Sequence, residues 1–186
     1  MKRLFAAVKI IPDKDFLDQL NGLKRELAHE RIKWVEDHNI HITLKFFGDT
    51  GEKKIPLIRD IFTGISKKQA VFGFYLRSLG IFGSRYDPRV IWTGIEPYDH
   101  FVDLMKEIRS ELKTIGYEPD RQNLVPHLTL GRIREIKDRK LFQQVIDKFG
   151  SISSRELTAG EFILFESILR KEGPVYIALH SFPFQK

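Results

Sequence analysis

The chain has 186 residues, of which 42% are hydrophobic and 12% aromatic. That is enough apolar surface for a packed core, and it excludes a disordered chain. The 31 basic residues exceed the 25 acidic ones and leave a net charge of +6, which favours a polyanionic partner or simply a well-solvated basic surface. Cysteine is absent, so disulfide frameworks, thiolate nucleophiles and cysteine-bound metals are excluded.

The N-terminal segment lacks the features of a targeting or membrane segment. Lys9 and Asp13 interrupt its apolar stretch too early for a signal peptide. Nor does any stretch of the chain approach the roughly 18 apolar residues that span a bilayer. We therefore expect a soluble, cytoplasmic protein with no membrane partner.

The first half of the chain alternates strand and helix patterns. A buried strand is predicted over residues 2–10, and a helix follows from about Asp13, with apolar residues at helical spacing at Phe16, Leu20, Leu23 and Leu27. Residues 40–46 alternate apolar and polar side chains, as a strand with one buried face does. A second helix begins near Ile55.

The middle of the chain predicts a boundary. Residues 70–79 and 89–95 are predicted strands, and a glycine-rich, proline-containing connection at residues 80–88 joins them. We expect this connection to separate two lobes of a single domain that covers residues 1–186. The same order of elements then recurs, with a helix from about 98, a strand over 125–130, a helix over 141–149, and strands over 156–165 and 175–181.

Two histidines occupy matching places in the two halves. His41 follows the start of the first helix by 28 residues (41 − 13), and His127 follows the start of the helix near Tyr98 by 29 residues (127 − 98). The similar distances favour a structural repeat, although the sequences of the halves are too different to establish one.

The same short motif surrounds both histidines. It runs His41-Ile42-Thr43-Leu44 in the first half and His127-Leu128-Thr129-Leu130 in the second, 86 residues later (127 − 41). Two such matches arise by chance about once in several thousand sequences of this kind. Because side chains alternate along a strand, each motif sets its His and its Thr on one face. The duplicated motif is therefore the candidate active site.

Paired His-x-Thr motifs supply the groups that opening a cyclic phosphodiester needs. One imidazole can remove a proton from the attacking water while the other protonates the departing ribose oxygen, because the ordinary pKa of histidine lies near neutrality. The two threonine hydroxyls can donate hydrogen bonds to phosphate oxygens. No metal or other cofactor is needed for this chemistry.

A structural histidine, a metal site and a serine nucleophile each account less well for the motifs. A single histidine on a strand is usually structural, but two in identical settings are not explained that way. A metal site needs three or four convergent ligands, and neither motif supplies a second ligand at the right spacing. A serine nucleophile would need a nucleophile-elbow pattern, which is missing. The remaining histidines fall outside the pattern and are predicted to be surface or structural residues: His29, His38, His100 and His180.

The segments HITLKFFG and HLTLGR resemble the paired motifs of the two-histidine phosphoesterases, specifically the LigT-like branch. Residues 33–35, 165–169 and 173–176 resemble that branch too. The resemblance implies a bilobal α+β fold, with antiparallel sheets around a central cleft and helices outside. It also implies hydrolysis of RNA 2',3'-cyclic phosphate ends to 2'-phosphates, with His41 as proton donor and His127 as proton acceptor. The expected partner is RNA, tRNA fragments included, or a cyclic-phosphate nucleotide, and the expected state is a monomer.

The family resemblance implies that Arg132 helps to hold the phosphate. A guanidinium can do so because its planar fork of N–H donors binds two oxygens. Strict alternation would instead turn Arg132 to the face of Leu128 and Leu130, unless a bulge at Gly131 or the end of the strand intervenes. A phosphate ligand and a solvent-exposed arginine therefore both remain open.

Three further residues have two interpretations each. Lys45 shares the predicted face of His41 and either adds positive potential there or is a solvated lysine at a strand end. Phe46 and Tyr176 could stack on nucleobases, although core packing is the preferred interpretation for Phe46.

Rival functions use the same residues. Reversible 2'-5' RNA ligation replaces the attacking water by a 5'-hydroxyl, and a phosphodiesterase for small cyclic nucleotides, such as an ADP-ribose cyclic phosphate, differs only in substrate. A non-catalytic RNA-binding module is the alternative from another class. The intact His and Thr in both motifs argue against that module.

Overall fold

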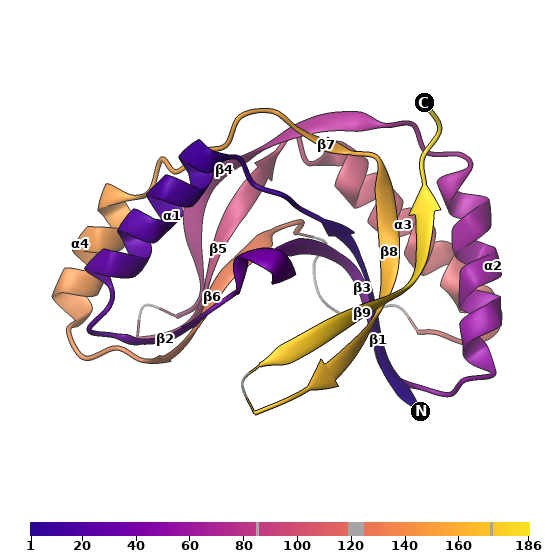
Figure 1. Cartoon of the computed structure of the whole chain (residues 1–186), viewed down its shortest axis with the longest axis horizontal. Helices are drawn as coiled ribbons and strands as arrows, with labels where there is room; N and C mark the ends of the chain where they lie inside the picture. The colour runs from indigo at the N-terminus through magenta and orange to yellow at the C-terminus, as the bar shows by residue number, and fades with distance from the viewer. Residues whose placement is uncertain (85, 119–124, 172) are drawn as a thin grey trace.

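The computed structural model describes residues 1–84, 86–118, 125–171 and 173–186. Its described part contains four helices and nine strands (Figure 1). The helices are α1 (Lys14–Glu26), α2 (Lys54–Ser66), α3 (Asp99–Leu112) and α4 (Arg139–Lys148). The strands are β1 (Lys2–Lys9), β2 (Arg31–Trp34), β3 (His41–Thr50), β4 (Phe72–Ser84), β5 (Asp87–Glu96), β6 (Leu128–Glu135), β7 (Leu157–Ala159), β8 (Glu161–Leu169) and β9 (Pro174–Pro183).

The predicted helices form where apolar spacing and caps favour them. The Asp13 side chain accepts a hydrogen bond from the backbone N–H of Phe16 at 3.1 Å and caps α1. In the same way the Asp138 side chain accepts from the N–H of Leu141 at 2.9 Å and caps α4. Each of the four helices buries one apolar face, as amphipathic helices on a globular protein do.

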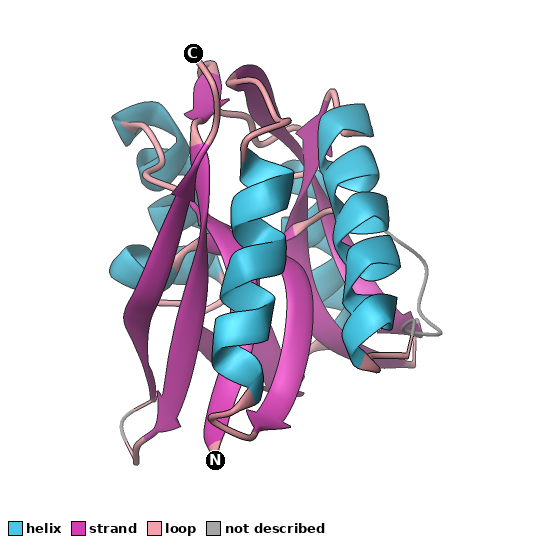
Figure 2. Ribbon diagram, turned by 90° about the vertical axis from the view of Figure 1, so that its right-hand side faces the viewer, coloured by secondary structure: helices cyan, strands magenta, loops and turns pink. Residues whose placement is uncertain are grey.

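The strands form one sheet in the order β7-β4-β5-β6-β3-β1-β8-β9, in which β2 pairs with β6 as a side branch, and the paired strands are antiparallel. Helices α1 and α4 lie at one end of the molecule and α2 and α3 at the other, with strands between them (Figure 1). From the side, two helices run next to each other in front of the strands (Figure 2). The predicted α+β class with antiparallel pairing is confirmed.

A narrow junction divides the sheet into two arms. The first arm is β3-β1-β8-β9 and the second is β6-β5-β4-β7, and the paired residues Ile42 and Leu128 join β3 to β6. Each arm takes strands from both halves of the chain, since β8 and β9 join the first arm and β4 joins the second. The proposed repeat boundary near residues 80–88 stays a prediction.

The strand limits predicted around residues 80–88 were wrong, because β4 runs on to Ser84 and β5 already begins at Asp87. The glycines of this segment lie within paired strands instead of a connection. A Cβ on Gly80 would fall 2.3 Å from the Trp92 ring, so the ring covers a position that only glycine leaves free. Gly83 has φ +115°, and the ladder is irregular between Phe82 and Gly83.

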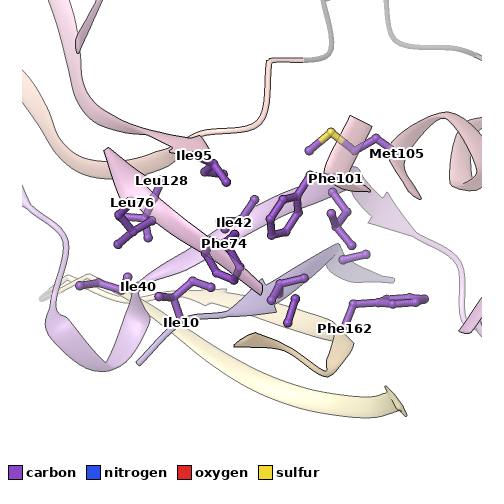
Figure 3. Packing of buried hydrophobic residues seen from close by; sticks show 14 of the residues in the cluster. Ile10, Ile40, Ile42, Phe74, Leu76, Ile95, Phe101, Met105, Leu128 and Phe162 are labelled. Carbon is purple, nitrogen blue, oxygen red and sulfur yellow. The ribbon is translucent and has the colours of Figure 1, made fainter. Parts of the chain in front are cut away.

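The core lies between the helices and one face of the sheet. Ile42, Leu128, Phe74, Leu76 and Phe101 are among its buried members (Figure 3). Both arms and all four helices contribute to the same cluster of buried residues. The junction between the arms is therefore anchored from the core side.

No helix in the described part of the chain is long and apolar enough to cross a membrane.

Candidate active site

The four motif side chains lie on the face of the sheet opposite to the core. Ile42 and Leu128, the middle residues of the two motifs, are fully buried on the core side (Figure 3). The residues that flank them are half-buried, as alternation along a strand requires. We call this side the motif face and define it by His41, Thr43, His127 and Thr129.

The antiparallel pairing sets the two motifs in opposite directions. Ile42 pairs with Leu128, so the two motifs run antiparallel past each other, and the His and Thr that flank each paired residue face the same side of the sheet. The charge of His127 acts on the pKa of His41, so the two histidines are close together. The structure thus brings together the four residues that the duplicated motif predicted.

Each imidazole is oriented by the same backbone contact. Nδ1 of His41 lies 2.6 Å from the carbonyl oxygen of Asn39, and Nδ1 of His127 lies 2.8 Å from the carbonyl oxygen of Val125. In each case the carbonyl belongs to the second residue before the histidine. A carbonyl accepts only, so Nδ1 must carry the proton that it donates. In both neutral rings Nε2 is then the atom free to take a proton.

Aromatic rings pack around His41. Its ring centroid lies 5.1 Å from that of Phe5 and 5.3 Å from that of Tyr176, which meets it edge to face. Phe5 stacks on Phe165 at 5.1 Å, and these rings belong to a small buried cluster separate from the main core. This cluster restricts the orientation of the imidazole and shields one side of it from water.

His127 has an equivalent aromatic environment in the second arm. Its ring lies 4.7 Å from Phe82 in an edge-to-face contact and 6.2 Å from Trp92. Phe82 and Trp92 stack at 4.8 Å, over the position that Gly80 leaves open. These aromatic supports were missed in the sequence, because their strands are far from the motifs along the chain and only sheet pairing brings them to the histidines.

Burial lowers the pKa of both His41 and His127 below the ordinary value for histidine. The backbone carbonyl contacts oppose this shift, whereas the nearby positive charge of Arg132 adds to it in both cases. The pKa of His41 is lowered further by His127 itself. The two imidazoles and Arg132 therefore share one electrostatic site, and its positive potential suits an anionic substrate.

A bulge decides where Arg132 points. In the pairing of β5 with β6, Trp92 is opposite Thr129 and its neighbour Ile91 is opposite Gly131, which leaves Leu130 as an extra residue. Leu130 and Gly131 are both buried, and Arg132 is exposed. The bulge shifts the alternation by one residue and returns Arg132 to the motif face. The sequence left open whether strict alternation turns Arg132 to the core side or a bulge turns it away. The structure has the bulge.

A matching bulge follows the first motif and corrects two predictions. Ala6 pairs with Lys45 and Ala7 with Thr43, so Leu44 is the extra residue. Lys45 therefore leaves the motif face and is only 5% exposed, which rules out a solvated lysine. Phe46 is 47% exposed and was wrongly predicted as a core residue. Phe46 occupies the same place after the first motif that Arg132 occupies after the second, because each lies five residues after the histidine of its motif.

The other four histidines lie outside the two motifs, and the ring centroid of His180 is 6.4 Å from that of Phe182. His29 lies beside the buried carboxylate of Glu30, with Nε2 and Oε1 3.1 Å apart. His100 stacks on Phe72 at 4.8 Å. His38 lines a hollow of about 140 Å³ next to His41 and Tyr176. Within the described ranges, no group of three or more His, Asp or Glu side chains could hold a metal ion.

Two antiparallel arms that meet at paired His-x-Thr strands fit the fold that the resemblance to the two-histidine phosphoesterases implies. The family model described as LigT like Phosphoesterase matches residues 10–92 and 95–176. The chain belongs to this family.

Two relatives match this chain over nearly their whole length. An RNA 2',3'-cyclic phosphodiesterase of Methanothermobacter thermautotrophicus is 31% identical over 182 residues, which is 97% of each chain. One from Aquifex aeolicus is 32% identical over 186 residues, which is 98% of each chain. Among solved structures, a Thermus thermophilus protein superposes with a TM-score of 0.80 at 26% identity, over 98% of this chain and 97% of its own. Escherichia coli LigT complexed with 3'-AMP has the same fold, with a TM-score of 0.75 at 20% identity, over 100% of this chain and 99% of its own.

Proposed function

We propose that this enzyme hydrolyses RNA 2',3'-cyclic phosphodiester ends to 2'-phosphomonoesters by acid/base catalysis with two histidines and without a metal. The full-length relatives named RNA 2',3'-cyclic phosphodiesterase support the reaction class. The observation that carries the proposal is the matching orientation of His41 and His127 on the motif face, each with Nδ1 against a backbone carbonyl.

The proposed reaction divides the proton transfers between the two rings. Nε2 of His127 takes a proton from water as the water oxygen attacks phosphorus. The bond from phosphorus to the ribose 3'-oxygen breaks, and protonated His41 gives its Nε2 proton to that oxygen. The phosphate then remains on the 2'-oxygen. The assignment of donor and acceptor follows the family resemblance, because both rings are anchored alike.

Thr43, Thr129 and Arg132 are proposed to bind the phosphate. The threonines lie on the motif face with the histidines, so their hydroxyls can donate hydrogen bonds to phosphate oxygens. Arg132 is close enough for its charge to lower the pKa of both histidines. The guanidinium can therefore stabilise the negative charge that gathers on the phosphate oxygens during attack.

One incubation tests the function. An oligoribonucleotide ending in a 2',3'-cyclic phosphate is mixed with the protein in EDTA, and the product is analysed for 2'- or 3'-phosphate. We expect the 2'-phosphate, with turnover unaffected by the chelator. A 3'-phosphate would contradict the proposed leaving group, and activity restored only by zinc or manganese would contradict metal independence. Added 5'-hydroxyl RNA in the same assay tests for 2'-5' ligation.

Each chain carries both motifs, so we expect the enzyme to act as a monomer, which gel filtration of the active protein tests. RNA, including tRNA fragments, is the proposed substrate class. The cytoplasmic location stays a prediction.

A further inference from the structure

A hollow of about 580 Å³ runs along the outer part of β5 and β6 to the start of α4, and the candidate active site adjoins it at Arg132. Arg132 belongs to both places, since it lines this hollow and its charge acts on His41 and His127. Arg132 therefore links the hollow to the candidate active site.

The hollow has an excess of positive charge. Its charged lining residues are four arginines and two carboxylates: Arg89, Arg132, Arg134, Arg139, Asp87 and Glu135. Both carboxylates already have ion-pair partners, since Asp87 is 2.7 Å from Arg89 and Glu135 is 2.9 Å from Arg31. Within the described ranges no carboxylate forms an ion pair with the other three arginines. Their charge is available to an anionic ligand.

The three arginines follow one another along the chain away from the active site. Arg132 and Arg134 are two residues apart on β6, and both are exposed and line this hollow. Arg139 begins α4 just beyond the end of β6. Such a row of cations can contact successive phosphates of an extended nucleic-acid strand.

An aromatic ring stands at the rim of the same hollow. Tyr86 is 77% exposed and lines this hollow together with Arg139. A second hollow of similar size shares Tyr86, Pro88, Ile136 and Arg139 with the first and extends it to Lys140. An exposed ring between cationic side chains is the combination by which proteins bind single strands, because every base has a face that can stack.

We propose that this surface, which we call the arginine groove and define by Tyr86, Arg132, Arg134 and Arg139, binds the single-stranded RNA on the 5' side of the cyclic phosphate. The proposal rests on the proposed function. A terminal cyclic phosphate leaves the strand only one direction in which to continue, and Arg132 connects the site to the groove. The preferred substrate is then an oligoribonucleotide, and a mononucleotide uses the catalytic residues alone.

The test compares two substrates at several salt concentrations. One is adenosine 2',3'-cyclic phosphate, and the other is a short oligoadenylate ending in the same group. The variant Arg134→Ala/Arg139→Ala is compared with Lys53→Ala/Lys67→Ala, which removes two charges from the ends of α2. These lysines are exposed and lie outside the groove. We measure kcat/KM for each substrate and take the ratio of oligonucleotide to mononucleotide.

For the wild type we expect a ratio well above one that falls with salt. Each lost phosphate contact lowers the log–log salt slope by about 0.7, so the double arginine variant should have a slope shallower by about 1.4. Over a fourfold rise in salt this is a difference of about sevenfold. The lysine control should match the wild type.

Equal ratios and equal slopes in the arginine variant and the lysine control would overturn the groove. A wild-type enzyme that cleaves the mononucleotide as efficiently as the oligonucleotide would overturn it too, while leaving the proposed reaction standing. Failure of the wild type on both substrates would instead contradict the proposed function. Circular dichroism verifies that the variants fold, and Tyr86→Ala provides a second variant, for which we expect a lower ratio with an unchanged salt slope.

Discussion

Gly131 lies in the bulge that turns Arg132 to the motif face, and one added methyl group there tests that geometry. A Cβ on Gly131 would fall 2.9 Å from Cγ2 of Ile32 and 2.9 Å from Cε3 of Trp34, both on β2. Carbon atoms in good contact are about 3.5–4.0 Å apart, so the side chains of Ile32 and Trp34 would have to move away by roughly 0.6–1.1 Å. Overpacking of this kind costs about 1–3 kcal/mol of unfolding free energy.

Urea unfolding and kcat/KM on a cyclic-phosphate oligonucleotide measure both consequences of Gly131→Ala. We expect a loss of about 1–3 kcal/mol in unfolding free energy. We also expect kcat/KM to fall roughly tenfold, because a displaced Arg132 loses part of a charged hydrogen bond worth about 1.5–3 kcal/mol. The control is Gly64→Ala on α2, where a Cβ meets nothing within 4 Å and helix propensity should add about 0.8–1.0 kcal/mol. If Gly131→Ala kept wild-type stability and activity, the bulge would not be what positions Arg132.

Other predictions concern the motif residues and one buried carboxylate. Replacing His41 or His127 by Ala should cut turnover at least roughly 100-fold, and Thr43→Ala or Thr129→Ala should cost less, because the proton transfers remain; single-turnover assays compare them. Catalysis needs one ring neutral and one protonated, and burial lowers both histidine pKa values. The pH dependence of kcat/KM should therefore be bell-shaped and centred below pH 6.5. A bound anion should move the bell for kcat to higher pH. A kcat/KM optimum well above pH 6.5 would contradict the lowered histidine pKa values. The buried Glu30 carboxylate accepts hydrogen bonds from the two backbone N–H groups just before α4, and Gln keeps only one acceptor oxygen. Glu30→Gln should therefore lower the unfolding free energy by about 1–3 kcal/mol. An unchanged urea midpoint would refute that role.

The duplicated motif and the element pattern were open to prediction because both are local. Alternation over residues 41–44 and 127–130 is enough to set His and Thr on one side and apolar residues on the other. Helix starts follow from capping side chains such as Asp13, which act within one turn. The α+β class and the four motif residues could thus be predicted from the amino-acid sequence, and the folded protein brings these four together.

What the tertiary structure alone decided is the direction of the residues after each motif. Alternation predicted Lys45 on the motif face and Phe46 in the core, and it left Arg132 undecided. With the bulges at Leu44 and Leu130, Lys45 lies on the core side, and Phe46 and Arg132 lie on the motif face. The bulges keep β3 in register with β1 and β6 in register with β5. Register between strands distant in sequence is a property of packing. For that reason the sequence by itself determined the class of fold and predicted the two motif histidines as the catalytic pair, while only the folded sheet determined which cations and rings surround these histidines.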